Sequence, residues 1–120
     1  MSLRSSSINV TALHKFANDI GGEDPNFLIE LIDSYLDNTQ SLPQDLYTSF
    51  AEQDFELMLR TAHALKSSSS VIGAEDMTEL RRELETSVRG KNYENLDIKI
   101  NEIADEYANV KSDLENEKCS

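Results

Sequence analysis

The sequence predicts an all-α protein, an antiparallel up-and-down four-helix bundle with a short additional N-terminal helix. Apolar residues recur every three or four positions along most of the 120 residues, and the connections between these periodic segments are short. No segment shows the alternation that is typical of a strand, and a content of only four Gly and two Pro favours helix. A chain of this length is most simply one domain with a single core.

The first expected helix covers residues 8–20, after a lead-in over residues 1–7 that we expect to be disordered. Gly21 and Gly22 end it, and its apolar stripe consists of Val10, Leu13, Ala17 and Ile20, with Phe16 alongside. His14 lies off the centre of this stripe with no base, nucleophile or metal ligand near it in the sequence. We therefore interpret His14 as an ordinary surface histidine.

The second expected helix begins at Asp24-Pro25, where a carboxylate can cap the helix and proline suits its first position. Its apolar period continues to Phe50 and stays in phase past Pro43. A proline either kinks a helix or divides it. Because the phase is kept, the sequence favours one long helix kinked near residues 39–42.

The third expected helix carries the most informative stretch of the chain. Asp54 can cap it, Glu56 adds favourable charge to its first turn, and Gly73 ends it after residue 72. Its buried face is expected to contain Phe55, Met58, Leu59, Ala62, Leu65, Ser69 and Ile72. At about 100° per residue, His63 lies roughly 120° from the middle of this face, so we expect the imidazole to be exposed.

Two more helices complete the expected bundle, which spans residues 8–116. Residues 75–88 form the first, with Gly90 as its stop, and Asn92 is expected to cap the second. We expect residues 117–120 to fray. The last helix has an unbroken a/d seam of Tyr93, Leu96, Ile100, Ile103, Tyr107, Val110 and Leu114. Such a seam fits a dimeric coiled coil or packing within a bundle, and we favour the bundle and hence a monomer.

Composition and motifs exclude several classes of function. A net charge of −12 argues against nucleic acid and anionic membrane surfaces as partners, and no apolar run approaches the ~20 residues of a membrane span. The single cysteine, Cys119, allows no disulfide within the chain, which fits the cytoplasm. The chain has no G-x-S-x-G, H-E-x-x-H or phosphate-binding glycine loop, and Arg60 stands where a di-iron bundle has Glu. We therefore expect no metal or cofactor in this chain.

The remaining candidate is His63 itself. Arg60 at i−3, Lys66 at i+3 and Ser67 at i+4 lie on the same helix surface. A solvent-exposed imidazole offers a ring nitrogen as nucleophile near neutral pH. A cation one turn along can stabilise the charge that develops on a phosphoryl group, and Arg60 is an auxiliary candidate. Two cations beside a histidine in so acidic a chain indicate an anion site, although such a histidine is also common on ordinary surfaces.

Residues 63–74 read HALKSSSSVIGA and resemble the H-x-L-K-G-S-S-x-x-x-G-A motif of histidine-containing phosphotransfer (HPt) domains of two-component phosphorelays. The order and lengths of the expected helices are similar to that family over nearly the whole chain. One position departs from the motif, because Ser67 stands where the family usually has glycine. The resemblance implies that this position keeps the surface clear for a partner, and that a small serine gives clearance or a hydrogen bond to the phosphoryl group.

The resemblance further implies a phosphocarrier rather than an autonomous kinase. His63 would relay a phosphoryl group between aspartates of response-regulator receiver domains, supplied through a hybrid sensor kinase, with Mg²⁺ bound by the receiver. Lys66 would stabilise charge, and an apolar docking patch would include Phe16 and Phe27. Two alternatives stay open: an adaptor that binds receivers without phosphotransfer, and the excised HPt domain of a larger hybrid or chemotaxis-type sensor kinase.

Overall fold

The structure, a computed structural model, describes residues 8–22 and 24–119, without the side chains of residues 25, 67–72 and 119. The predicted lead-in over residues 1–7 lies outside the described residues. All regular structure in the described part is helical. The helices are α1 (Val10–Gly21), α2 (Pro25–Thr39), α3 (Leu42–Glu52), α4 (Phe55–Ile72), α5 (Glu75–Arg89) and α6 (Leu96–Cys119).

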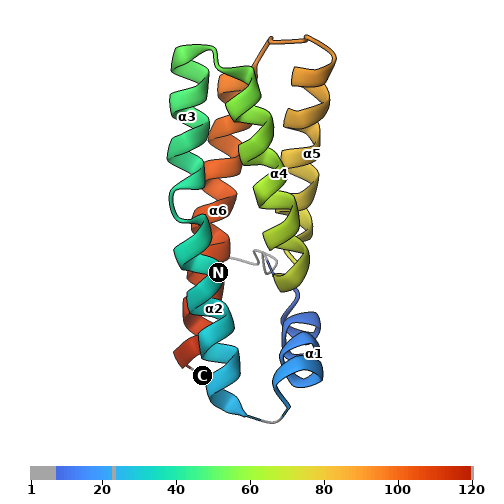
Figure 1. Cartoon of the computed structure of the whole chain (residues 1–120), viewed down its shortest axis with the longest axis vertical. Helices are drawn as coiled ribbons and strands as arrows, with labels where there is room; N and C mark the ends of the chain where they lie inside the picture. Colours follow the sequence, from blue (N-terminus) through green and yellow to red (C-terminus); the bar gives the residue numbers. More distant parts are fainter. Residues whose placement is uncertain (1–7, 23, 120) are drawn as a thin grey trace, which may run out of the picture.

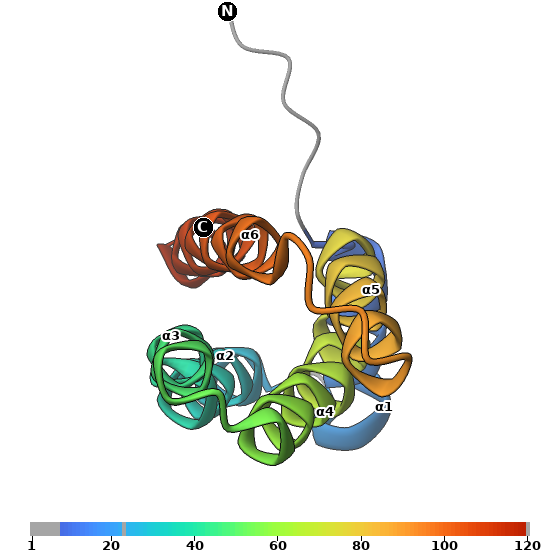
Figure 2. The ribbon, with the colours of Figure 1, turned by 90° about the horizontal axis from the view of Figure 1, so that it is seen from above.

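Four of these helices form a closed bundle. The helix α3 contacts α4, α4 contacts α5, α5 contacts α6, and α6 returns to α3, as the end-on view shows (Figure 2). Successive helices from α3 to α6 run in alternating directions (Figure 1). The helix α2 continues the column of α3 and also packs on α6, while α1 lies across the lower end and contacts α2 and α4 (Figure 1). The predicted all-α bundle with an additional N-terminal helix is confirmed.

Most of the predicted helix ends follow from local capping. The Asp24 carboxylate accepts a hydrogen bond from the Asn26 amide (2.9 Å), and the Asp54 carboxylate accepts one from the Leu57 amide (3.0 Å). Each bond satisfies an amide that has no partner within its helix. Gly73 ends α4 with φ +68°, in the left-handed region that favours glycine.

The predicted single kinked helix over residues 24–50 is wrong, because the hydrogen-bond ladder divides it at residues 40–41. Pro43 has no amide hydrogen, so the ladder cannot pass through it unbroken. The helix α3 instead restarts with a bond from the Asp45 amide to the Ser41 carbonyl (2.9 Å). Gln40 and Ser41 keep right-handed helical angles, so α3 continues in the general direction of α2 and the two share one corner of the bundle (Figure 2).

The start of the last helix also differs from the prediction. Asn92 forms a local turn by accepting a hydrogen bond from the Glu94 amide (3.3 Å), and α6 begins only at Leu96. Tyr93 is 43% exposed and stacks on Phe55 with ring centroids 4.1 Å apart, so it is not a core residue. The later seam residues are buried as predicted: Leu96, Ile100, Ile103, Tyr107, Val110 and Leu114.

The C-terminal end of α6 contacts α1 and α2 at the lower end of the bundle. The helix α6 extends to Cys119, and Lys118 in its last turn forms an ion pair with Asp33 of α2. A weaker contact joins His14 of α1 to Glu117 at 3.9 Å. Within α1, Leu13 and Ala17 are buried as predicted. Val10 (37% exposed) and Ile20 (61% exposed) are not, because α1 packs through a narrower face than its apolar stripe.

Candidate functional site: an exposed histidine on α4

The middle of α4 presents His63 to solvent while its neighbours anchor the helix. Ala62 and Leu65 are fully buried, and His63 is exposed, so the predicted orientation of this helix is confirmed. Thr61 is 4% exposed and its hydroxyl donates to the Leu57 carbonyl (2.9 Å), which satisfies it within the helix. The imidazole therefore lies on a helical turn whose neighbouring side chains are packed in the core.

Two cations share this surface with His63. Arg60 and Lys66 are both exposed, and their positions three residues before and after the histidine place their side chains beside it. No ion pair links Arg60 to any residue that the structure describes, whereas Arg81, Arg82 and Arg89 all pair with glutamates. The surface around His63 is thus locally basic in a chain of net charge −12.

The fourth predicted site residue, Ser67, belongs to α4, but its side chain lies outside the described residues. The same holds for Ser69 and Ile72, which were expected on the buried face. The backbone helix nevertheless continues to Ile72, so four consecutive serines are accommodated in regular helix. Position 67 is one turn beyond His63, on the same surface.

The end of α4 is tied to the start of α1 through Gly73. The Asn9 amide donates to the Gly73 carbonyl (3.0 Å), and a Cβ at residue 73 would lie 2.7 Å from the Asn9 Cβ. Real Cβ atoms essentially never approach so closely, so glycine is needed here for space as well as for its positive φ. The helix that carries His63 is therefore held against α1.

The corner between α1 and α2 carries the apolar residues expected to dock a partner. Phe16 and Phe27 are half-buried, and the Phe27 ring occupies the space that a side chain at Gly21 would need. More of the exposed apolar surface comes from Ile20 (61% exposed) and Ile29 (36% exposed), which sequence reasoning missed. Ile29 lies off the apolar stripe of α2, and this position is the only feature of the sequence that indicates an exposed apolar side chain there.

The described residues include no group of three or more His, Cys, Asp or Glu side chains that could hold a metal ion. None of the described helices is both long and apolar enough to span a membrane.

The chain matches a known protein family over most of its length. A family model described as "Hpt domain" matches residues 30–113. Because that match covers well over half of the chain, the chain belongs to the Hpt domain family, whose members act in two-component signalling.

One solved structure is similar over almost its entire length. It is the crystal structure of histidine-containing phosphotransfer protein B (HptB) from Pseudomonas aeruginosa PAO1, with a TM-score of 0.82 and 22% sequence identity over 96% of each chain. At this level of identity the likeness shows a shared fold. No curated protein sequence gives a significant match.

Proposed function

We propose that this chain is a phosphocarrier in which His63 accepts a phosphoryl group from an aspartyl phosphate of one receiver domain and delivers it to an aspartate of another. The observation that carries the proposal is that His63 is exposed on α4 between the exposed cations Arg60 and Lys66, while the opposite face of α4 is buried. The chain is also a member of the Hpt family. The donor would be charged by a hybrid sensor kinase, and we expect the exchange to take place in the cytoplasm between a monomer and its partners.

The transfer step is a displacement at phosphorus. A ring nitrogen of His63 forms the N–P bond while the bond between phosphorus and the donor's carboxylate oxygen breaks, and the carboxylate leaves. The second transfer reverses these roles. Charge on the phosphoryl oxygens would be stabilised by Lys66, with Arg60 as an auxiliary cation, and by Mg²⁺ held in the receiver domain rather than in this chain.

Ser67 would set how closely a receiver approaches. Serine adds only a hydroxymethyl group to the usual glycine, so we expect docking to survive and the hydroxyl to give clearance or a hydrogen bond to the phosphoryl group. Replacing Ser67 with Leu keeps a good helix former but adds bulk one turn from the histidine. Ser67→Leu should therefore block transfer in a folded protein, and Ser67→Gly should leave it nearly unchanged.

Mixing the protein with a phosphorylated receiver domain and following acid-labile, base-stable phosphate tests the proposal. His63→Gln should gain no label, whereas His14→Gln, which alters an exposed histidine of α1, should gain it at the wild-type rate. A second, unphosphorylated receiver should then remove the label. Receiver binding without any label would support the adaptor alternative, and labelling only by a tethered ATP-binding domain would support the excised domain of a chemotaxis-type kinase.

A further inference from the structure

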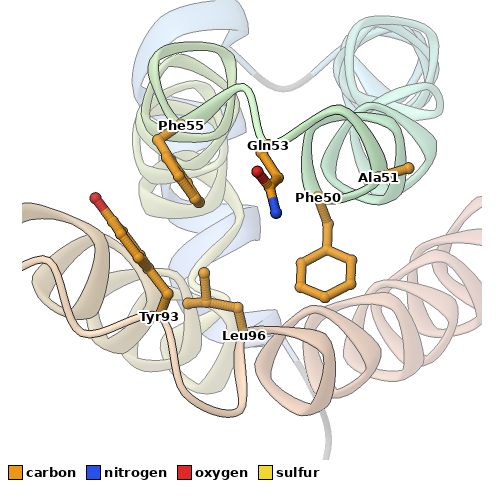
Figure 3. A pocket seen from close by; sticks show the side chains of 6 residues that line it. All are labelled: Phe50, Ala51, Gln53, Phe55, Tyr93 and Leu96. Atoms are coloured by element: carbon orange, nitrogen blue, oxygen red, sulfur yellow. The ribbon is translucent and has the colours of Figure 1, made fainter.

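An aromatic pocket opens at the end of the bundle opposite α1, where the α3–α4 and α5–α6 connections meet (Figure 3). Its volume is about 590 Å³, which is within the range of small-molecule sites. The lining residues are Phe50, Ala51, Gln53, Phe55, Tyr93 and Leu96. The pocket faces the interior side of α4, whereas His63 is on the outer side of that helix, so it is separate from the phosphotransfer surface.

The walls of the pocket are flat and apolar. Tyr93 and Phe55 stack in parallel, with planes only 2° apart, and form one side. Phe50, which is 40% exposed, forms another, and the fully buried Leu96 closes the floor. None of the six lining residues is charged, although 28% of the chain's residues are. This lining suits an uncharged planar molecule.

One polar group points into this apolar space. The side-chain amide of Gln53 is directed toward the cavity between Phe50 and Phe55 (Figure 3). No hydrogen bond joins this amide to another group in the described part of the chain. An amide both donates and accepts, so it can fix the orientation of a ligand that carries an N–H or a hydroxyl.

The backbone at Gln53 is strained in the same place. Its φ of 54° lies in the left-handed region, which costs a residue with a Cβ of the order of 1 kcal/mol relative to glycine. Gly73 and Gly22 occupy the positive-φ positions at two other helix ends of this chain. Glycine would serve equally well as the stop of α3, yet it would remove the amide from the pocket.

From these observations we infer that the pocket is a binding site for a small, uncharged, flat aromatic molecule with one hydrogen-bonding group, oriented by the Gln53 amide. The stacked rings of Phe55 and Tyr93, together with Phe50, would contact the faces of the ligand ring. The Gln53 amide would form a hydrogen bond with the polar group at the edge of the ligand. This site is independent of the proposed phosphotransfer, because it uses none of the residues around His63.

Indole is a suitable probe, and 1-methylindole keeps its ring system but carries a methyl group in place of the N–H donor. Titration of the isotopically labelled full-length protein with indole, followed by amide NMR, should give saturable shifts at residues 50–55 and 93–96 with a Kd of about 0.1–1 mM. 1-Methylindole should bind roughly 3–10-fold more weakly, the loss expected for one hydrogen bond. Phe50→Ala should abolish saturation by either probe.

The decisive variant is Gln53→Gly, with Lys91→Gly as its matched control. Lys91 also has a positive φ (58°) after a helix end, is exposed, and does not line the pocket. Both variants should raise the thermal midpoint by roughly 2–5 °C through relief of strain. Only Gln53→Gly should lose the preference for indole over 1-methylindole, with indole binding weakened roughly 3–10-fold.

Three results would overturn the inference. The first is the absence of saturable shifts with indole, and the second is saturation at residues away from the pocket. The third is an unchanged preference for indole in Gln53→Gly, which would show that the amide plays no part in recognition. All three readouts are independent of phosphotransfer, so they stand whether or not His63 carries a phosphoryl group.

Discussion

The hydroxyl groups of Thr39 and Tyr107 lie 2.9 Å apart in the bundle interior, joining the last residue of α2 to the middle of α6. The Thr39 hydroxyl also donates to the Tyr35 carbonyl (2.7 Å), so it accepts the hydrogen of Tyr107. Thr39 is fully buried and Tyr107 is 7% exposed. This bond holds α2 against α6 just before the ladder breaks at residues 40–41.

Removing the Tyr107 hydroxyl should therefore destabilise the bundle modestly. Tyr107→Phe keeps the ring and leaves Thr39 with its backbone partner, so the expected loss is about 0.5–1.5 kcal/mol in the free energy of unfolding. Thr39→Val leaves the tyrosine hydroxyl buried without its partner and should lose about 1–3 kcal/mol. Urea denaturation measures both, and equal losses in the two variants would contradict this hydrogen-bond assignment.

Stability in acid should depend on Glu85. Burial raises the pKa of this carboxyl, but the hydrogen bonds and charges of Arg89 and Arg81 outweigh burial, and the pKa is lowered overall. A lowered folded-state pKa gives stability that is present above the unfolded value of about 4.3 and is lost as the pH falls through the folded value. Glu85→Gln should therefore flatten the decline in stability below about pH 5.

The same variant should also lower stability at neutral pH. Arg81 is only 5% exposed, and loss of its partner leaves a buried cation at a cost of about 1–3 kcal/mol. Glu79→Gln is the control, because its ion pair with Arg82 is more than half exposed at both side chains. Such pairs contribute about 0.5 kcal/mol or less. Urea denaturation from pH 3 to 8 measures the stability of both variants. Equal losses of stability in Glu85→Gln and Glu79→Gln across this range would contradict the role given to Glu85.

Lys66 should matter to the rate of phosphotransfer and little to stability. Lys66→Ala removes the cation one turn beyond His63 and should slow transfer roughly 10–100-fold. We expect a smaller loss than for removal of a buried hydrogen-bond donor from an active site, because water screens the charge of an exposed lysine. Arg60→Ala should slow it about 2–5-fold. Lys111→Ala makes the same change of charge at an exposed position of α6 and should leave the rate unchanged. Equal rates for Lys66→Ala and Lys111→Ala would rule out a local role for Lys66.

The junction at Gly73 should be intolerant of a side chain. Gly73→Ala meets both the crowding against Asn9 and the positive φ, and should lose about 1–3 kcal/mol of stability. Gly90→Ala is the comparison, because Gly90 has an ordinary φ of −81° and its added Cβ would lie 3.3 Å from the Thr86 carbonyl oxygen and 3.9 Å from that of Ser87. Thermal melts should therefore order the three proteins with Gly73→Ala clearly lowest, and a melt of Gly73→Ala at the wild-type temperature would contradict the packing described.

The helix ends that sequence reasoning located were those fixed by local chemistry. Asp24 and Asp54 cap their helices through amides two and three residues away, and Gly73 stops α4 through its own φ. The orientation of His63 likewise follows from helical periodicity. Each of these features depends only on a short stretch of chain, so the sequence contains the information that sets it.

The errors arose where distant contacts decide the outcome. The spacing of Tyr93 fits the seam of the last helix, but its ring stacks on Phe55, some forty residues earlier, and the helix starts later. Ile20 fits the stripe of α1, but the way α1 packs leaves it exposed. The helical spacing of apolar residues does continue past Pro43. Only the backbone hydrogen bonds show that this spacing runs through two separate helices, α2 and α3. The aromatic pocket depends on two connections meeting in space, which no local pattern specifies.

The most direct test of the central claim is to locate the phosphoryl group on the protein. After incubation with a phosphorylated receiver domain, tandem mass spectrometry under alkaline conditions should find the modification on His63 alone, and it should be absent from His63→Gln. Phosphate on His14, on a serine of residues 67–70, or equally on His63→Gln and wild type would contradict the assignment of His63 as the carrier.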